Sequence, residues 1–409
     1  MISRTGNGVH LSIGVIALNV ALVLLYSPNF ASALFPAVKG FQLAGFAWLV
    51  VLLLARQPRI KPLDLGLFAF LGCVVASTLV NATRFDNPEA TYIAFSFLLK
   101  CLHVIALFLY CRSDAGLKMA TRGLVAVLAL FAAHGLLQFI AVPMGWAGSY
   151  GTLDYGGYEY VNLGWLGIYR VGFVVDSTEF VRVQSFFQEP GFFAFYMLFG
   201  LMLCHHPGVG LGRKVRGAAV VLFVTVTLMT LSLTGIVLLG VYAAFKLRSL
   251  WFKTVIGLVV AGTVYIIVTS ENEFIGKAGS FALRLDDYAI LELMLRSWMS
   301  LAFGIGMGND PMLGEMRINN IVFELYMYAS PLGLLIMSLI LIAALKRSAR
   351  ANHVLIMTIA YALSTPMAWS PLFYCAIYLT CMSPGSRSGR PGVRQHSWAA
   401  TPPSALSAA

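Results

Sequence analysis

Residues 37–61 read AVKGFQLAGFAWLVVLLLARQPRIK, and this stretch contains the pattern that decides the fold. An apolar run over 37–55 is followed at once by three basic residues, Arg56, Arg59 and Lys61. At a rise of ~1.5 Å per residue, a run of this length crosses the ~30 Å hydrocarbon core of a membrane as a helix. The stretch therefore predicts a membrane span that ends in a basic, cytoplasmic loop.

The rest of the chain repeats this pattern. The 409 residues are 59% apolar and 11% charged, whereas a soluble domain carries about 25% charged residues. A soluble enzyme, a nucleic-acid binder and a disulfide-rich secreted protein are therefore all disfavoured. The sequence predicts an all-α polytopic membrane protein of about 12 transmembrane helices. The predicted spans are 9–27, 37–55, 63–81, 92–111, 121–143, 190–206, 217–232, 235–247, 252–269, 320–345, 352–366 and 369–383.

The basic residues indicate the orientation of these spans. They gather in triplets on alternate loops, for example Arg213, Lys214 and Arg216, and only two of the 17 acidic residues share those loops. By the positive-inside rule, the triplets and the N-terminus are cytoplasmic. The net charge of +11 is then a sign of topology rather than of nucleic-acid binding. We expect no cleavable signal peptide before the first span.

The domain organisation follows from the same reading. Residues 1–383 form one integral membrane domain with two long outer loops, 144–189 and 270–319, and 384–409 form a disordered cytoplasmic tail rich in Pro, Ser and Gly. A break at Ser232–Gly235 divides two short spans. The six cysteines lie in or beside apolar runs and are expected to be buried.

The sharpest local motif is the end of the first outer loop, Arg182 to Ala194, which reads RVQSFFQEPGFFA. Pro190 can open a helix, so Glu189 is either its N-cap or an ionised carboxylate that accepts a proton from a sugar hydroxyl. Arginines gather in the same two loops, where a planar guanidinium suits a lipid diphosphate. The alternative is that they form surface ion pairs. The arginines concerned are Arg170, Arg182, Arg284 and Arg296.

Polar residues inside the predicted spans form a second set. Asn320 and Glu324 are spaced i, i+4 on one helix face, and an acid at that depth is a functional candidate. Lys100 lies mid-span and needs a partner or an aqueous cavity. His134 and Gln138 are spaced i, i+4 in the fifth span and are expected mainly to hydrogen-bond another helix. The segment 304–309, GIGMGN, is expected to bring backbone close to a ligand or a helix rather than to bind a nucleotide.

In these motifs the chain resembles the O-antigen polymerase and ligase superfamily, the Wzy-type membrane glycosyltransferases. The resemblance is carried by the pattern R-x-x-S-x-F-x-E-P-x-x-x-A at Arg182–Ala194 and by the break at Ser232–Gly235. It continues with Arg284 ahead of Gly304-x-Gly306, and with the span that opens at Asn320 and contains Gly333. Together these motifs extend over roughly residues 90–345, and their order is more specific than any one of them.

The resemblance implies a GT-C-like architecture in the bacterial inner membrane and polymerisation of undecaprenyl-diphosphate-linked oligosaccharides into O-antigen or exopolysaccharide at the periplasmic face. It implies no metal, nucleotide or other cofactor. Expected partners are the lipid-linked substrate, membrane lipids, and a chain-length regulator and flippase of the same pathway, with no nucleic acid.

The residues singled out above receive candidate roles, and the resemblance implies that loop arginines bind the diphosphate. Glu189 is the candidate catalytic carboxylate and Glu324 its rival. The expected diphosphate- and substrate-binding residues are Arg182, Arg284, Arg170, Arg296, Ser185, Asn320 and Lys100. The alternatives are an O-antigen ligase, or a lipid-linked glycan flippase or other transporter. Ligase-like members often carry His-Asn where this chain has Asn319-Asn320, which disfavours the ligase.

Overall fold

The structure is a computed structural model, and it describes most of the chain up to residue 382. The described residues are 7–26, 31–146, 148–155, 158–169, 171–175, 178–206, 209–246, 254, 258, 290, 292, 294–309, 320–347, 352–363 and 370–382. The fold is mostly helical, at 78%. Most of the predicted span 252–269, most of the second outer loop and the tail from 384 lie outside the described residues.

Helices account for the predicted spans. The first are α1 (Asn7–Leu24), α2 (Ala31–Leu34), α3 (Ala37–Arg56), α4 (Pro62–Arg84), α5 (Pro88–Tyr110) and α6 (Asp114–Ala141). The later ones are α7 (Pro190–Cys204), α8 (Arg213–Met229), α9 (Leu233–Lys246), α13 (Trp298–Phe303), α14 (Ile321–Arg347), α15 (Asn352–Ala362) and α16 (Pro371–Met382). Every predicted span except 252–269 coincides with one of these helices.

Length and apolarity separate the helices into two classes. Among the described residues, α3, α4, α5, α6 and α14 are long and apolar enough to cross a membrane. Helices α7, α9, α15 and α16 and the segment Ile13–Leu24 of α1 are apolar but shorter. The chain is thus a helical membrane protein, whereas a total of about 12 crossings stays a prediction.

The first outer loop departs from the all-α prediction. Its strands are β1 (Thr152–Tyr155), β2 (Tyr158–Asn162), β3 (Ile168–Tyr169), β4 (Val171–Val175) and β5 (Thr178–Val181). Strands β1, β2 and β3 form an antiparallel sheet, and β4 pairs with β5 in a hairpin. A short 3-10 helix, Gly164–Leu166, lies between β2 and β3. The loop is rich in valine and tyrosine, which favour strands, so the all-α prediction needs this local correction.

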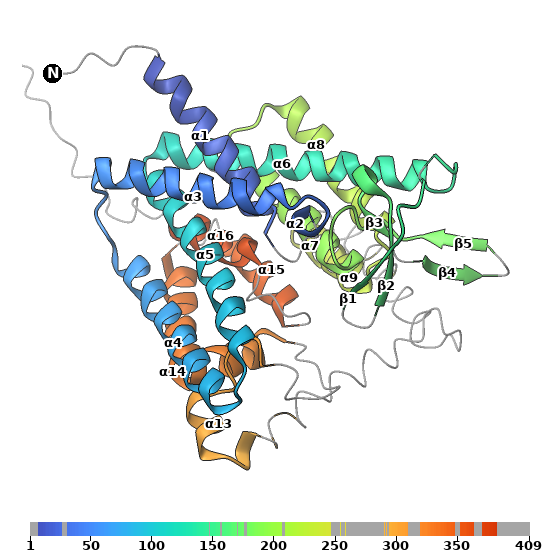
Figure 1. The fold of residues 1–409 in the computed structure, drawn as a ribbon. Coiled ribbons are helices and arrows are strands. Elements are labelled where there is room, and N and C mark those ends of the chain that lie inside the picture. Colours follow the sequence, from blue (N-terminus) through green and yellow to red (C-terminus); the bar gives the residue numbers. More distant parts are fainter. Residues whose placement is uncertain are drawn as a thin grey trace, which may run out of the picture.

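Two groups of helices meet in the fold. Helices α4, α5 and α14 run side by side, and α1, α3 and α6 pack together at another end of the molecule (Figure 1). Helix α14 is interrupted at Ser330, with φ 69°, immediately before Pro331, whose ring cannot continue the helical hydrogen bonds. Past this break, a Cβ at Gly333 would lie 3.2 Å from the Cβ of Cys73 on α4. Gly333 therefore permits close packing of α14 on α4.

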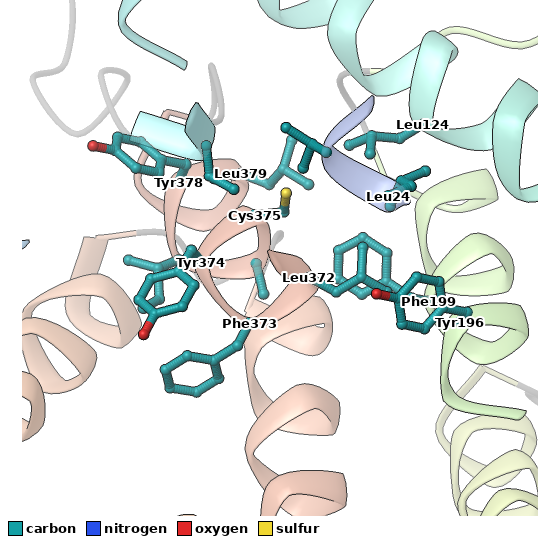
Figure 2. Close-up of a cluster of buried hydrophobic side chains, with 14 of the residues drawn as sticks. Leu24, Leu124, Tyr196, Phe199, Leu372, Phe373, Tyr374, Cys375, Tyr378 and Leu379 are labelled. Atoms are coloured by element: carbon teal, nitrogen blue, oxygen red, sulfur yellow. The ribbon is translucent and has the colours of Figure 1, made fainter. Parts of the chain in front are cut away.

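Helix α16 lies inside the protein rather than against lipid. All of its residues from Pro371 to Thr380 are buried. Figure 2 shows Leu372 directed toward Tyr196 and Phe199 of α7. On another side, the ring of Tyr378 stacks on Phe108 of α5, with 4.9 Å between centroids. Hydropathy alone does not distinguish such a helix from a lipid-facing one such as α3, most of whose surface is exposed.

A buried ion pair joins the basic ends of three helices. Asp64, in the first turn of α4, pairs with Arg112, which follows α5. The hydroxyl of Tyr378 on α16 donates to the same carboxylate at 2.9 Å, and the backbone N–H of Lys61 donates to it at 2.7 Å. A fully buried carboxylate needs such partners, because the charge has lost its water.

The segment Gly304–Asn309 is a packing loop between α4, α5 and α14. Its three glycines have φ values of 71°, 72° and 78°. The N–H groups of Ile305 and Gly306 donate to the carbonyl of Met327 on α14, at 2.9 and 3.1 Å. The N–H of Met307 donates to Thr78 on α4 at 3.0 Å. The prediction that this backbone lies close to another helix is confirmed.

We predict that Gly306→Ala destabilises the protein, because the new Cβ would lie 2.7 Å from the Cα of Thr78 at a positive φ. The expected loss is at least ~1 kcal/mol, seen as a lower midpoint of thermal unfolding in detergent. Gly72→Ala on α4 is the matched control. A Cβ there meets nothing within 4 Å, so this variant should be neutral or more stable. Equal midpoints for the two variants would contradict the packing role.

Candidate active site

The end of the first outer loop is irregular backbone held inside the protein. After β5, residues 182–189 form no helix or strand ladder, and α7 begins at Pro190, as predicted. Ser185 has φ 55° and is fully buried. A Cβ at Gly167 would collide with the backbone of Ser185, so only glycine allows the two segments to approach this closely.

Gln138 on α6 bonds both of these loop segments and holds them close to each other. Its amide nitrogen donates to the carbonyls of Leu166 and Ile168, at 3.0 and 2.8 Å. Its amide oxygen accepts from the N–H groups of Gln184 and Ser185, at 3.2 and 2.9 Å. One fully buried side chain thus satisfies four backbone groups of two loop segments.

His134, one turn earlier on α6, adds two further bonds to the same segments. Its Nε2 lies 2.9 Å from the carbonyl of Trp165, and its Nδ1 lies 2.8 Å from the hydroxyl of Ser185. A carbonyl can only accept, so Nε2 carries the proton and Nδ1 accepts from Ser185 in the neutral ring. The ring of Phe186 stacks on the imidazole at 4.4 Å. The expectation that His134 and Gln138 bond another helix is therefore wrong: both side chains bond the loop and fix it to α6.

Arg182 connects the loop to the break between α8 and α9. Its Nε and one terminal nitrogen donate to the carbonyls of Thr230 and Leu231, both at 3.3 Å. The N–H of Val183 donates to Met229 at 3.4 Å. The helices separate at residues 230–232, and α9 starts two residues before Gly235. Two motifs that are far apart in sequence, the loop end and the predicted break, therefore lie against each other.

Glu189 occupies the N-cap position of α7, but its carboxylate makes no cap hydrogen bond. The side chain is exposed. Next to it, the carbonyl of Gly191 accepts from the hydroxyl of Tyr361 on α15, at 2.5 Å. A Cβ at Gly191 would lie 3.7 Å from the hydroxyl of Ser232. Glu189 thus borders a polar junction of α7, α9 and α15, with its carboxylate not used as a cap.

Lys100 and Glu324 are two buried residues of opposite charge in the interior. Lys100 on α5 is 2% exposed and Glu324 on α14 is fully buried. The two charges interact electrostatically, and Glu324 also acts on the buried Tyr374 of α16. Lys100 thus has the oppositely charged neighbour that a buried ammonium requires. This cluster joins α5, α14 and α16.

The structure gives several predicted binding residues a structural contact. Asn320 caps α14, since its side-chain oxygen accepts from the N–H groups of Val322 and Phe323 at 3.0 and 3.1 Å. Ser185 is buried rather than open to a substrate, because its hydroxyl bonds His134. Arg296 forms an exposed ion pair with Glu292 at 2.8 Å. Arg170 and Arg284 lie outside the described residues.

Two further contacts were not predicted from sequence. Tyr361 falls in an apolar span, and only the packing of α15 on α7 brings its hydroxyl to Gly191. Arg84, at the end of α4, donates to the hydroxyls of Ser300 and Ser297 at 3.0 and 3.1 Å, which ties α13 to α4. The signal for Arg84 was its departure from the positive-inside rule. In the described part of the chain, no group of three or more His, Cys, Asp or Glu residues could hold a metal ion.

We predict that Gln138→Leu strongly destabilises the outer loop, because it leaves four buried backbone groups without a partner. Each such group costs ~1–3 kcal/mol. Gln42→Leu is the control, since Gln42 is also buried but makes one hydrogen bond, of 3.3 Å, to Leu22. Protease cleavage within 144–189 and thermal unfolding in detergent should both respond far more to Gln138→Leu. Similar responses to the two changes would show that the four bonds contribute little.

Comparison with known protein families and with curated proteins finds no match for this chain. The resemblance to Wzy-type glycosyltransferases therefore rests on the motifs of the sequence alone.

Proposed function

We propose that this protein is a membrane glycosyltransferase that polymerises oligosaccharides carried on undecaprenyl diphosphate. We place it in the bacterial inner membrane, with its reaction at the periplasmic face. The proposal follows the ordered motifs of the sequence. The structural observation that supports it best is the junction of the loop end, Arg182–Glu189, with the break between α8 and α9. These are two motifs of the family pattern, and Glu189 is exposed beside them.

The reaction would be a displacement at an anomeric carbon. A hydroxyl oxygen of the acceptor glycan forms a bond to the anomeric carbon of the donor glycan. The bond from that carbon to the diphosphate oxygen breaks, and its electron pair leaves with the lipid diphosphate. The hydroxyl proton passes to the Glu189 carboxylate. Neutralising the leaving diphosphate is the larger electrostatic demand, and arginine guanidinium groups meet it with bidentate hydrogen bonds.

The contacts distinguish among the four candidate arginines. Arg182 already donates to Thr230 and Leu231, so part of its hydrogen-bonding capacity serves the fold. Arg296 pairs with Glu292 at the surface. Arg284 and Arg170, at positions outside the described residues, are therefore our first choices for the diphosphate.

Glu189 is a better candidate for the proton acceptor than Glu324. Glu324 is fully buried and interacts with the charge of Lys100. A carboxylate in that position stabilises a buried cation, and its replacement would leave Lys100 without that charge. Glu189 is exposed at the start of a helix, where a side chain can reach a ligand.

The contacts of three polar residues argue against the alternative function of a transporter. Its path would be lined by Lys100, His103, His134 and Gln138. His103 is bonded to Asn19 at 2.8 Å and to Tyr26 at 3.2 Å. His134 and Gln138 hold the outer loop. Side chains fixed in this way do not line an open path. An O-antigen ligase stays the nearest alternative, and the assay below separates it.

We predict that Glu189→Gln and Glu189→Asn lower polymer formation roughly 10²-fold at unchanged thermal stability. Stability should hold because the carboxylate makes no cap bond, and Asn caps well. The assay is conversion of a lipid-diphosphate-linked repeat unit into longer chains by purified protein in vesicles. Glu89→Gln is the control, an exposed acid that follows Pro88 at the start of α5. Wild-type chain length from Glu189→Asn would leave Glu189 a structural role only.

We predict that Arg284→Ala abolishes chain growth and that Arg284→Lys rescues it poorly, because a point charge does not reproduce a bidentate fork. Arg296→Ala should have a smaller effect, since its guanidinium is engaged by Glu292. Unchanged polymer from Arg284→Ala would remove this residue from the diphosphate site. If the purified wild type moves glycans to lipid A-core without lengthening them, it is a ligase. If it changes neither length nor carrier, it is no transferase.

A further inference from the structure

Cationic side chains from two helices converge on the short connection between α7 and α8, which lies beside α6 (Figure 1). Arg122 on α6 donates through Nε to the carbonyl of Val209 at 2.8 Å, and through Nη2 to that of Gly210 at 2.7 Å. Arg216 on α8 donates to the carbonyl of the next residue, Leu211, at 3.1 Å. The two guanidinium groups thus hold three consecutive carbonyls of one chain segment.

Lys118 brings a third cation to the same segment. It lies one turn before Arg122 on α6. A Cβ at Gly210 would lie 3.3 Å from the ammonium of Lys118 and 3.5 Å from Nη2 of Arg122, so both groups lie within 3.5 Å of one point. The side chains of Lys118, Arg122 and Arg216 are exposed, and we call these three residues the basic cluster.

No acid pairs with the basic cluster in the described part of the chain. Asp114, one turn before Lys118 on α6, is exposed and forms no ion pair with it. Arg213 and Lys214 add positive charge in the first turn of α8, where the helix dipole favours acids instead. The positive-inside rule accounts for cations in these loops, but not for their convergence on one point.

We propose that the basic cluster binds a phosphate group. A guanidinium has five N–H donors, and the contacts with the carbonyls use two on Arg122 and one on Arg216. The other donors, with those of the Lys118 ammonium, suit the oxygens of a phosphate, which accept charge-assisted hydrogen bonds. The carbonyls already hold both guanidinium groups in place, which lowers the entropy cost of binding.

The phosphate has two possible sources. Val215 and Val221 on α8 are exposed apolar residues, so a lipid can lie beside this helix with its head group at the basic cluster. A soluble phosphate monoester reaches the same exposed side chains from water. Helix α7 separates the cluster from Glu189, and this proposal does not depend on the proposed reaction.

The test measures the binding of two probes to the purified full chain in detergent. Dioleoyl phosphatidylglycerol is followed by native mass spectrometry, and glycerol 3-phosphate by isothermal titration calorimetry. Binding of the lipid alone would support the proposal with a lipid head group as the source. Binding of glycerol 3-phosphate would support it with a soluble phosphate. If neither probe binds, the proposal is wrong.

Variants locate the site for whichever probe binds. Lys118→Gln with Arg216→Gln should weaken binding about fivefold for each cation removed. The matched control is Arg59→Gln with Lys346→Gln, which removes two exposed cations from other basic loops and should leave binding unchanged. Lys118→Glu alone should also weaken binding without lowering the unfolding midpoint, because this side chain forms no hydrogen bond with another described residue. Equal losses from the two double variants, or full binding by Lys118→Glu, would overturn the proposal.

Discussion

The four hydrogen bonds of Gln138 are the contact on which the packing of residues 166–168 against 184–185 depends. Within the depth of a membrane, water is not at hand to satisfy irregular backbone, so each carbonyl and N–H needs a partner in the protein. Gln138 supplies two donors and two acceptors at one buried point and serves residues 166–168 and 184–185. The position of Glu189 follows from this, because Ser185 is fixed four residues before it.

The need of buried polar groups for hydrogen-bond partners also explains contacts in other parts of the fold. The glycine loop places its N–H groups on the carbonyl of Met327, which the break of α14 near Ser330 leaves without its usual helical donor. Asp64 accepts from Lys61, Arg112 and Tyr378 at the other end of α4. In each case a helix end or break is completed by a residue distant in sequence. The membrane thus turns hydrogen bonding, rather than hydrophobic burial, into the term that fixes the tertiary contacts.

The helices could be predicted from the sequence because the pattern that indicates them is local. An apolar run with a basic end predicts a span wherever it occurs, and α3 begins and ends within a residue of its predicted bounds, 37–55. The strands at 152–181 were not predicted, because their pairing depends on residues outside each strand. Nor did the sequence show that Ser185 is buried or that α16 is enclosed, since α3 and α16 are comparably apolar and only packing tells them apart. The motifs were found, but the contacts of Arg182, Asn320 and Arg296 required the fold.

The N-caps offer a physical reason to single out Glu189. Ser113, Ser297 and Asn320 each use their side chains to cap a helix, as these residue types prefer. Asn87 at the start of α5 does not cap, and its amide instead donates to Gly308 and Asn309. In that case the polar side chain makes hydrogen bonds elsewhere instead of capping the helix. Glu189 also makes no cap hydrogen bond. Its helix begins with Pro190, which has no backbone N–H, so the first turn has one N–H fewer that needs a partner. The stability of α7 therefore does not require a carboxylate at this position, and the charge of Glu189 is not needed to complete the helix.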